Sequence, residues 1–200
     1  MSRRLTPLGP DRLNDEQRAL YERVAGGPRR KMGISLLDEQ GALLGPFNAY
    51  LHTPELGARL ESAGVALREV ASLAPRLREI AILMTAKHHR SQFEWYAHAS
   101  IARDEGLSEQ AIEAIKQGRD PGFSDPTEAA VHAFAAELLE KRRVSDATFD
   151  ALAARLPEKE RVELVFVLGY YALVSMTLNV FEVPLPQGEQ PPFPEAGAPD

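Results

Sequence analysis

The chain has 200 residues and contains no cysteine. It therefore cannot form a disulfide, a thiolate metal site or a thiol nucleophile, which excludes thiol redox chemistry. Positive charge is also scarce, because 23 Lys and Arg residues stand against 29 Asp and Glu residues and give a net charge of −6. A nucleic-acid-binding domain usually presents a basic face. We therefore expect no nucleic-acid partner, and we interpret the basic stretch Arg29–Lys31 as a solvated loop.

Long uninterrupted apolar runs are absent as well. The most apolar segment, residues 162–183, contains Glu163, Asn179 and Glu182. Charged and amide side chains are costly inside a bilayer, so this segment is interpreted as a buried helix rather than a membrane span. The first residues carry no apolar run typical of a signal peptide. These features predict a soluble, cytoplasmic protein without a membrane partner.

The residues that are present indicate an all-α fold. With 44% hydrophobic residues in 200, the chain can build one core, so a single domain is expected. Apolar residues recur at helical spacing, and helix start signals such as Thr53-Pro54 and Asp125-Pro126 precede several of these segments. We predict a helical bundle of about seven to eight helices. The main expected helices cover residues 15–24, 54–73, 75–88, 92–105, 109–117, 126–141 and 158–183.

Composition divides the chain into three regions. Residues 1–44 are expected to form an N-terminal helix and loop extension, and residues 45–183 the helical domain. Within residues 29–52, three glycines and Pro46 interrupt any period, which predicts a long loop or one short helix. Residues 184–200 contain six prolines and are expected to form an extended tail.

Three polar residues share one face of a predicted helix. Ser91, Glu94 and His98 lie three and four residues apart, the spacing of neighbours on a helix surface. Together with Glu79 upstream they supply a hydroxyl, carboxylates and an imidazole, which is a set suited to proton transfer. Two structural alternatives remain open. Ser91 and Glu94 can form a capping box, and Glu79 can form a surface ion pair with a neighbouring arginine.

The same helix offers only a weak metal-site pattern. Glu94 and His98 have the i, i+4 spacing of two ligands on a helix, and His88 and His89 lie nearby in sequence. A third ligand at a defined spacing is missing, and adjacent histidines at a helix end point in different directions. We therefore expect no metal site.

Several segments resemble the carboxymuconolactone decarboxylase family, part of the alkylhydroperoxidase D-like superfamily. The likeness is strongest in RLREIAIL (76–83), EWYAH (94–98) and EGLSE (105–109), which match in order and at the family's spacing. GPFN (45–48) with HTP (52–54), and LNVFEVP (178–184), are similar to the longer branch of the family. With these segments the resemblance covers most of residues 45–186.

The resemblance implies roles for particular residues. In the peroxidase branch of the family, two cysteines occupy the positions held here by Ser91 and Glu94, while Glu79 and His98 fall on the family's glutamate and histidine positions. Neither a hydroxyl nor a carboxylate can cycle through a disulfide, so a thiol peroxidase is excluded. The lack of the cysteine pair resembles the decarboxylase branch. The family also implies an alkylhydroperoxidase D-like fold and a homo-oligomer, typically a trimer or hexamer.

These observations predict a decarboxylase-like enzyme, or a related lyase or isomerase, that acts on a small carboxylated lactone or keto-acid. Such a substrate accepts its own electrons in its carbonyl, so no cofactor is expected. His98 is the predicted proton donor, with Glu94 and Glu79 as the other catalytic residues. The residues expected to contact substrate are Ser91, Trp95, His52, Asn48 and Asn179. The alternative is a catalytically silent helical oligomer that binds a small apolar ligand or serves as an assembly module.

Overall fold

The computed structural model describes residues 4–27 and 35–194, and all of its regular structure in these ranges is helical. Eight of the nine α-helices described have seven or more residues, and a single β-bridge, Leu37 to Leu43, is the one extended pairing in these ranges. The all-α prediction is therefore confirmed. The helices are α1 (Asp15–Gly26), α2 (Phe47–Leu51), α3 (Pro54–Glu69), α4 (Pro75–His88), α5 (Gln92–Asp104), α6 (Glu109–Gln117), α7 (Pro126–Lys141), α8 (Asp146–Ala153) and α9 (Glu158–Val180).

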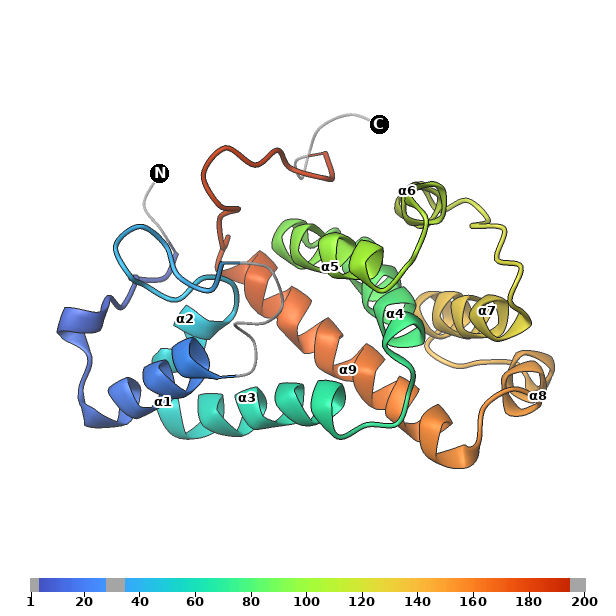
Figure 1. The fold of residues 1–200 in the computed structure, drawn as a ribbon, viewed down its shortest axis with the longest axis horizontal. Helices are drawn as coiled ribbons and strands as arrows, with labels where there is room; N and C mark the ends of the chain where they lie inside the picture. The colour runs from blue at the N-terminus through green and yellow to red at the C-terminus, as the bar shows by residue number, and fades with distance from the viewer. Residues whose placement is uncertain (1–3, 28–34, 195–200) are drawn as a thin grey trace.

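Helix α4 is the centre of the bundle. Residues 77–86 of α4 are all buried, and α4 packs against α5, α6, α7 and α9 (Figure 1). A helix that is buried on every side carries little amphipathic pattern. Polar residues between positions 77 and 86 are therefore placed in the interior, and Glu79 is one of them.

Local start signals explain where several helices begin. At α1, the Asn14 side chain accepts a hydrogen bond from the Gln17 amide at 2.9 Å, and the Gln17 side chain accepts one from the Asn14 amide at 3.0 Å. Ser108 and Asp125 cap α6 and α7 in the same way through their side-chain oxygens. These caps satisfy backbone amides that lack partners inside the helix. The helix starts are thus determined over a few residues of sequence.

Helix α3 buries small residues beside α2 and leaves some of its large apolar residues exposed. The apolar residues Leu56, Leu60, Val65, Leu67 and Val70 lie on or near one side of this segment. Leu60 and Leu67 pack partly buried against the core, whereas Leu56 is 54% and Val70 75% exposed. The buried positions of α3 are instead Gly57, Glu61 and Gly64. An added Cβ at Gly57 would lie 2.5 Å from the Tyr50 carbonyl oxygen, so a bare backbone lets α2 pack directly on α3.

The N-terminal region shares a small core with α2 and α3. Leu20 and Val24 of α1 pack in one cluster with Leu43, Phe47 and Leu51. The expected boundary between residues 44 and 45 runs through this cluster, because Leu43 and Phe47 belong to it together. The single short helix expected within residues 29–52 is α2. The basic stretch Arg29–Lys31 lies outside the described residues.

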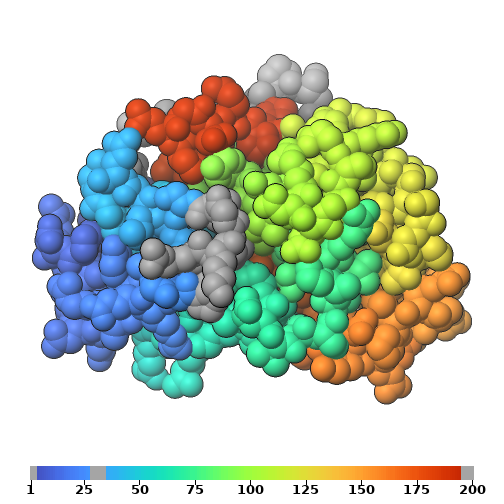
Figure 2. All heavy atoms as spheres, in the orientation of Figure 1, coloured from blue at the N-terminus to red at the C-terminus, as the bar shows by residue number. Residues whose placement is uncertain are grey.

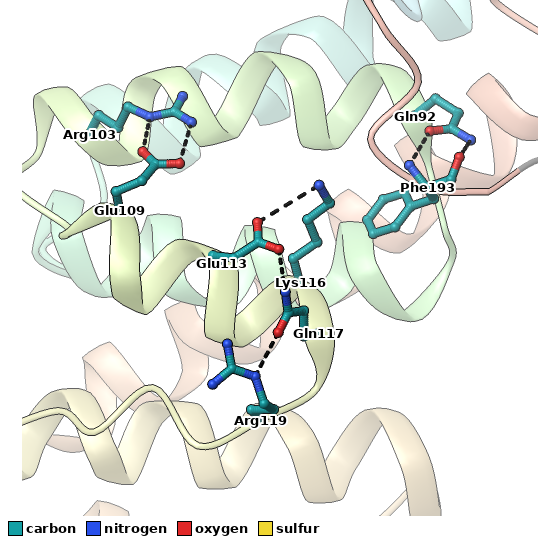
Figure 3. Close-up of polar contacts among 8 residues, drawn as sticks. All are labelled: Gln92, Arg103, Glu109, Glu113, Lys116, Gln117, Arg119 and Phe193. Atoms are coloured by element: carbon teal, nitrogen blue, oxygen red, sulfur yellow. Dashed lines mark hydrogen bonds and ion pairs between the residues drawn. The ribbon is translucent and has the colours of Figure 1, made fainter. Parts of the chain in front are cut away.

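The tail up to residue 194 lies against α5. Gln92 receives a hydrogen bond from the Phe193 amide and donates one to the Phe193 carbonyl, each at 2.9 Å (Figure 3). The Phe193 ring is only 7% exposed and packs edge-on against Trp95, with ring centroids 5.3 Å apart. Figure 2 shows the red tail lying between the blue N-terminal region and the yellow-green surface of α5 and α6.

The Phe193→Ala variant tests this anchor. Removing a buried aromatic ring typically costs about 3 kcal/mol of unfolding free energy, because a cavity replaces its contacts. We expect that loss in urea denaturation, together with faster proteolysis of the tail. Phe149→Ala is the matched control, since Phe149 is 44% exposed and should cost much less. Equal losses in the two variants would contradict a buried anchor at Phe193.

Candidate active site

A tight turn between α4 and α5 brings Glu79 of α4 next to His98 of α5. The Ser91 amide donates to the Ala86 carbonyl at 2.9 Å, and the Arg90 amide donates to the Lys87 carbonyl at 3.0 Å. This pair of bonds is a Schellman motif, which requires a left-handed residue at its centre. Arg90 fills that position with a φ of 49°. The turn folds α5 back along α4, so that His98 faces Glu79.

Two carboxylates hold the His98 ring from both sides. His98 Nδ1 lies 2.6 Å from Glu79 Oε2, and His98 Nε2 lies 3.2 Å from Glu94 Oε1. All three side chains are buried, and Glu79 is fully inaccessible. An imidazole can bond two acceptors through both nitrogens only when both carry protons. The geometry therefore fits a protonated His98 between two carboxylates.

The electrostatics of the site favour the same protonation state. Burial by itself lowers the pKa of His98, because desolvation disfavours the charged imidazole. The charge and hydrogen bond of Glu79, and then those of Glu94, outweigh burial and raise the pKa of His98 to about 9. At neutral pH the ring is thus an imidazolium that can donate a proton.

Two arginines and a tyrosine surround the array formed by Glu79, His98 and Glu94. Arg78 Nε lies 3.6 Å from Glu79 Oε1, on the side of that carboxylate away from His98. Arg68 Nη1 donates to the Tyr171 hydroxyl at 2.9 Å. The Tyr171 ring stands edge-on to the His98 ring, with centroids 4.9 Å apart. Helices α3, α4, α5 and α9 therefore each contribute a side chain to the site.

The array opens on a pocket with mostly apolar walls. Its empty volume is about 440 Å³, part of which is open to solvent. Ligand pockets commonly combine apolar walls with a few polar groups. The polar groups here are Arg68, Glu94 and His98. The apolar walls include Pro46, Phe47, Phe93, Ala97, Tyr170 and Val174.

Both structural alternatives for these residues prove wrong. Ser91 precedes α5, but its hydroxyl accepts no capping hydrogen bond, and Glu94 points to His98 instead of back to Ser91. The Ser91 hydroxyl is buried and has no hydrogen-bond partner. Glu79 is inaccessible, so it is not part of a surface ion pair. The polar residues at the start of α5 are therefore not explained as a helix cap.

Other residues expected to contact substrate lie away from this pocket. Trp95 is buried in the main core beside Phe193. The Asn48 side chain bonds the backbone of Leu8, and His52 Nε2 lies 3.0 Å from the Thr6 carbonyl oxygen. Asn179 donates to the His89 carbonyl at 2.7 Å on the surface. Each of these side chains fastens a loop or terminus, and none lines the pocket that contains Glu94 and His98.

Sequence reasoning missed Arg68, Tyr170 and Tyr171. Arg68 sits in the last turn of α3, and the two tyrosines lie in the middle of the apolar helix α9. Arginines at helix ends are common, so Arg68 carried no signal of its own. The arginines that lie nearer to Glu79 and His98 in the sequence have other partners. Arg76 pairs with Glu128, and Arg90 donates to the Pro194 carbonyl.

The array is arranged for proton transfer. In residues 4–27 and 35–194 no group of three or more His, Asp or Glu side chains has a geometry that would hold a metal ion. Imidazolium and carboxylate groups within hydrogen-bonding distance can donate, accept and relay protons. Enclosure beside an apolar pocket strengthens these charges toward a bound molecule. The site can therefore carry general acid–base chemistry on a small ligand.

Comparison with known proteins agrees with this architecture. Residues 54–136 match the model of the carboxymuconolactone decarboxylase family, a range that contains Glu79, Glu94 and His98. No curated protein sequence matches the chain. Twelve solved chains match the structure, and three of them illustrate the shared fold.

The first is a variant of the debrominase Bmp8 in which alanine replaces a cysteine, solved in complex with 2,3,4-tribromopyrrole. It is similar to this chain with a TM-score of 0.73 and 14% identity, and 94% of each chain is covered. The second is an alkylhydroperoxidase AhpD core protein, peroxidase-related, from Ralstonia eutropha, with a TM-score of 0.72, 17% identity, and 92% of this chain and 93% of that chain covered. The third, an AhpD-type protein of unknown function from Agrobacterium tumefaciens, has a TM-score of 0.63 and 19% identity, with 71% and 98% covered. At these identities the likeness shows the fold.

Proposed function

We propose that the protein is a decarboxylase-like acid–base enzyme, because residues 54–136 match the model of the carboxymuconolactone decarboxylase family. Its substrate would be a small carboxylated lactone or keto-acid, and related lyase or isomerase chemistry falls in the same class. The observation that carries the proposal is the buried array Glu79–His98–Glu94 at the wall of an apolar pocket. Without cysteine the chain uses no thiol cycle.

The proposed reaction needs one proton at carbon. As the C–C bond to the departing carboxylate breaks, its electron pair moves through the conjugated system to the lactone or keto oxygen, and carbon dioxide leaves. The resulting enolate then takes a proton at carbon, and water restores the proton to the enzyme. The substrate is its own electron sink, so the protein has to supply only desolvation, charge stabilisation and a proton.

The geometry suggests a division of labour among the three residues. The imidazolium of His98 is the proton source and stabilises the enolate. Glu79, bonded to Nδ1 at 2.6 Å and closed off from solvent, fixes the ring and keeps it protonated. Glu94 lines the pocket beside His98 and bonds Nε2. It can therefore position or relay the proton.

A ligand screen followed by a turnover assay tests this function. Carboxylated lactones and keto-acids are first tested for an upward shift of the unfolding midpoint, because a ligand that binds the native state stabilises it by mass action. Hits are then incubated with enzyme while carbon dioxide release is followed. Release that depends on enzyme concentration supports the proposal. Stabilisation without any chemical change in the ligand favours the alternative, a silent binding protein.

We also propose that the protein is a homo-oligomer, and α9 supports this. By length and composition α9 is a candidate membrane span, yet only 44% of its most apolar window is buried inside the molecule. Its outward side chains include Val162, Phe166, Met176 and Val180, all exposed. With Gly169 and Leu173 these residues alternate spacings of four and three, which is typical of a seam between two helices.

The Phe166→Asp variant tests α9 as the subunit contact. Wild type is expected to run as an oligomer, and burying an uncompensated carboxylate in the seam should weaken assembly at least about tenfold. Sedimentation equilibrium measures the change. Val70→Asp is the matched control, because Val70 is 75% exposed and lies outside the row on α9. Unchanged assembly of Phe166→Asp, or equal dissociation of both variants, would rule out this face as the contact.

A further inference from the structure

Arg68 is a cation of the pocket wall that has no carboxylate partner among the described residues. Its Nη1 atom donates to the Tyr171 hydroxyl at 2.9 Å, while its Nη2 atom is buried and has no hydrogen-bond partner. A buried donor left without an acceptor costs free energy, more so when the group is charged. The guanidinium is a planar fork that matches a carboxylate with two parallel bonds. The unused Nη2 donor is thus available to an anionic ligand.

The charges around the pocket point to the same conclusion. Among the described residues around the pocket, three cations, Arg68, Arg78 and protonated His98, stand against two anions, Glu79 and Glu94. Glu79 and Glu94 already contact His98 or Arg78, so the surplus positive charge lies on Arg68. An uncompensated charge at a partly desolvated site is unfavourable until an opposite charge arrives. Arg68 is therefore the cation of this pocket that an anionic group of a ligand would neutralise.

We propose that Arg68 is the anion-binding residue of this pocket and that it holds one carboxylate of the ligand, the one that is not transformed. Pairing with arginine stabilises a carboxylate as the anion, which opposes its loss as carbon dioxide. The departing group must instead lie away from Arg68, toward Glu94 and His98. The inference rests on the proposed function for the identity of the reacting end, whereas binding of an anion at Arg68 stands independently of it.

Tyr171 sets the distance between the two ends of the site. Its hydroxyl accepts from Arg68, and its ring contacts the His98 ring at 4.9 Å between centroids. The anion-binding end and the proton-donating end are thus separated by about one tyrosine side chain. A small ring with a carboxylate at one side spans this distance. Arg68 would therefore determine which end of the ligand faces His98.

A purely structural role for Arg68 makes a different prediction. Through Tyr171 the residue also fastens α3 to α9, so its loss could lower stability alone. In that case carboxylate and neutral ligands would lose affinity equally. An anion-binding role changes only the preference between them. The test therefore measures a ratio of affinities rather than a single affinity.

The experiment uses 5-oxotetrahydrofuran-2-carboxylate and its uncharged primary amide as matched probes, with binding measured by titration calorimetry. Wild type is expected to prefer the carboxylate at least about tenfold. Arg68→Met should abolish this preference and leave amide affinity unchanged. Arg68→Lys, which keeps the charge but not the fork, should retain part of the preference. Arg59→Met is the control, since it removes an exposed arginine of the same helix that pairs with Glu55.

Each outcome bears on the inference. Wild type that binds both probes equally, or neither up to about 10 mM, overturns it, as does a carboxylate preference that survives in Arg68→Met. Should Arg68→Met fail to fold, Arg68→Lys with an undiminished preference also overturns the bidentate pairing. The assay needs no turnover. A preference that depends on Arg68 in a protein that releases no carbon dioxide supports the anion site and contradicts only the proposed reaction.

Discussion

The His98→Gln variant is expected to lower the rate of decarboxylation at least about a hundredfold, because glutamine cannot donate and recover a proton. Glutamine has a comparable size and can still bond one of the two flanking carboxylates. The loss should fall on kcat rather than on KM, since the ligand's carboxylate is held by Arg68 and not by His98. Steady-state kinetics on the substrate identified by the screen measures both parameters.

His132→Gln is the control for this variant. His132 is a half-buried histidine of α7, on another side of α4 from the candidate active site, and burial lowers the pKa of its imidazole. Turnover of this variant should match wild type. Full activity in His98→Gln would remove His98 from the mechanism. Equal losses in both variants would point to a general effect on folding.

Wild-type stability is expected to fall by about 3 kcal/mol between pH 6 and pH 9.5 because of His98 alone. Its folded pKa, raised to about 9, lies above the ordinary value of 6.5. A raised pKa means that the folded state holds the proton more tightly than the unfolded chain. The stabilisation is therefore fully present below pH 6.5 and is lost as the pH rises through 9.

Urea denaturation across this pH range measures the effect. His98→Gln should show a much smaller decline, because the titrating ring is gone. Glu79→Gln removes the charge and strongest hydrogen bond that raise the pKa of His98, so its decline should begin at lower pH and be smaller. A wild-type decline that matches His98→Gln would contradict a protonated His98 at the core of the site.

The helices were predictable from the sequence because their signals are local. The side chains of Asn14, Ser108 and Asp125 bond amides only two or three residues away, so a short stretch determines each helix start. The spacing of Glu94 and His98 is equally local, since one turn of helix makes them neighbours. Glu79 could be assigned to the same site only through the resemblance to the family, because nineteen residues separate it from His98.

The rest of the structure depends on packing between distant segments. In α3, for example, Gly57 is buried because α2 packs directly on it, and the partner of that contact cannot be identified from the sequence of α3 itself. Asn48, His52 and Asn179 look like site residues, yet each bonds a backbone group of a terminus or turn that folding brings beside it. The partner of such a polar side chain depends on which backbone groups the fold places beside it.

By itself the sequence determined an all-helical chain without thiol chemistry and with a carboxylate and an imidazole on one helix face. Those properties follow from composition and from contacts within one or two turns. Only the tertiary structure decided that Glu79 closes the second side of His98 and that Arg68 and Tyr171 complete the pocket. These contacts join α3, α4, α5 and α9 across the core. The physical reason is the burial of α4: its one carboxylate, Glu79, lies inside the molecule and is stabilised there only by a charged or hydrogen-bonding partner.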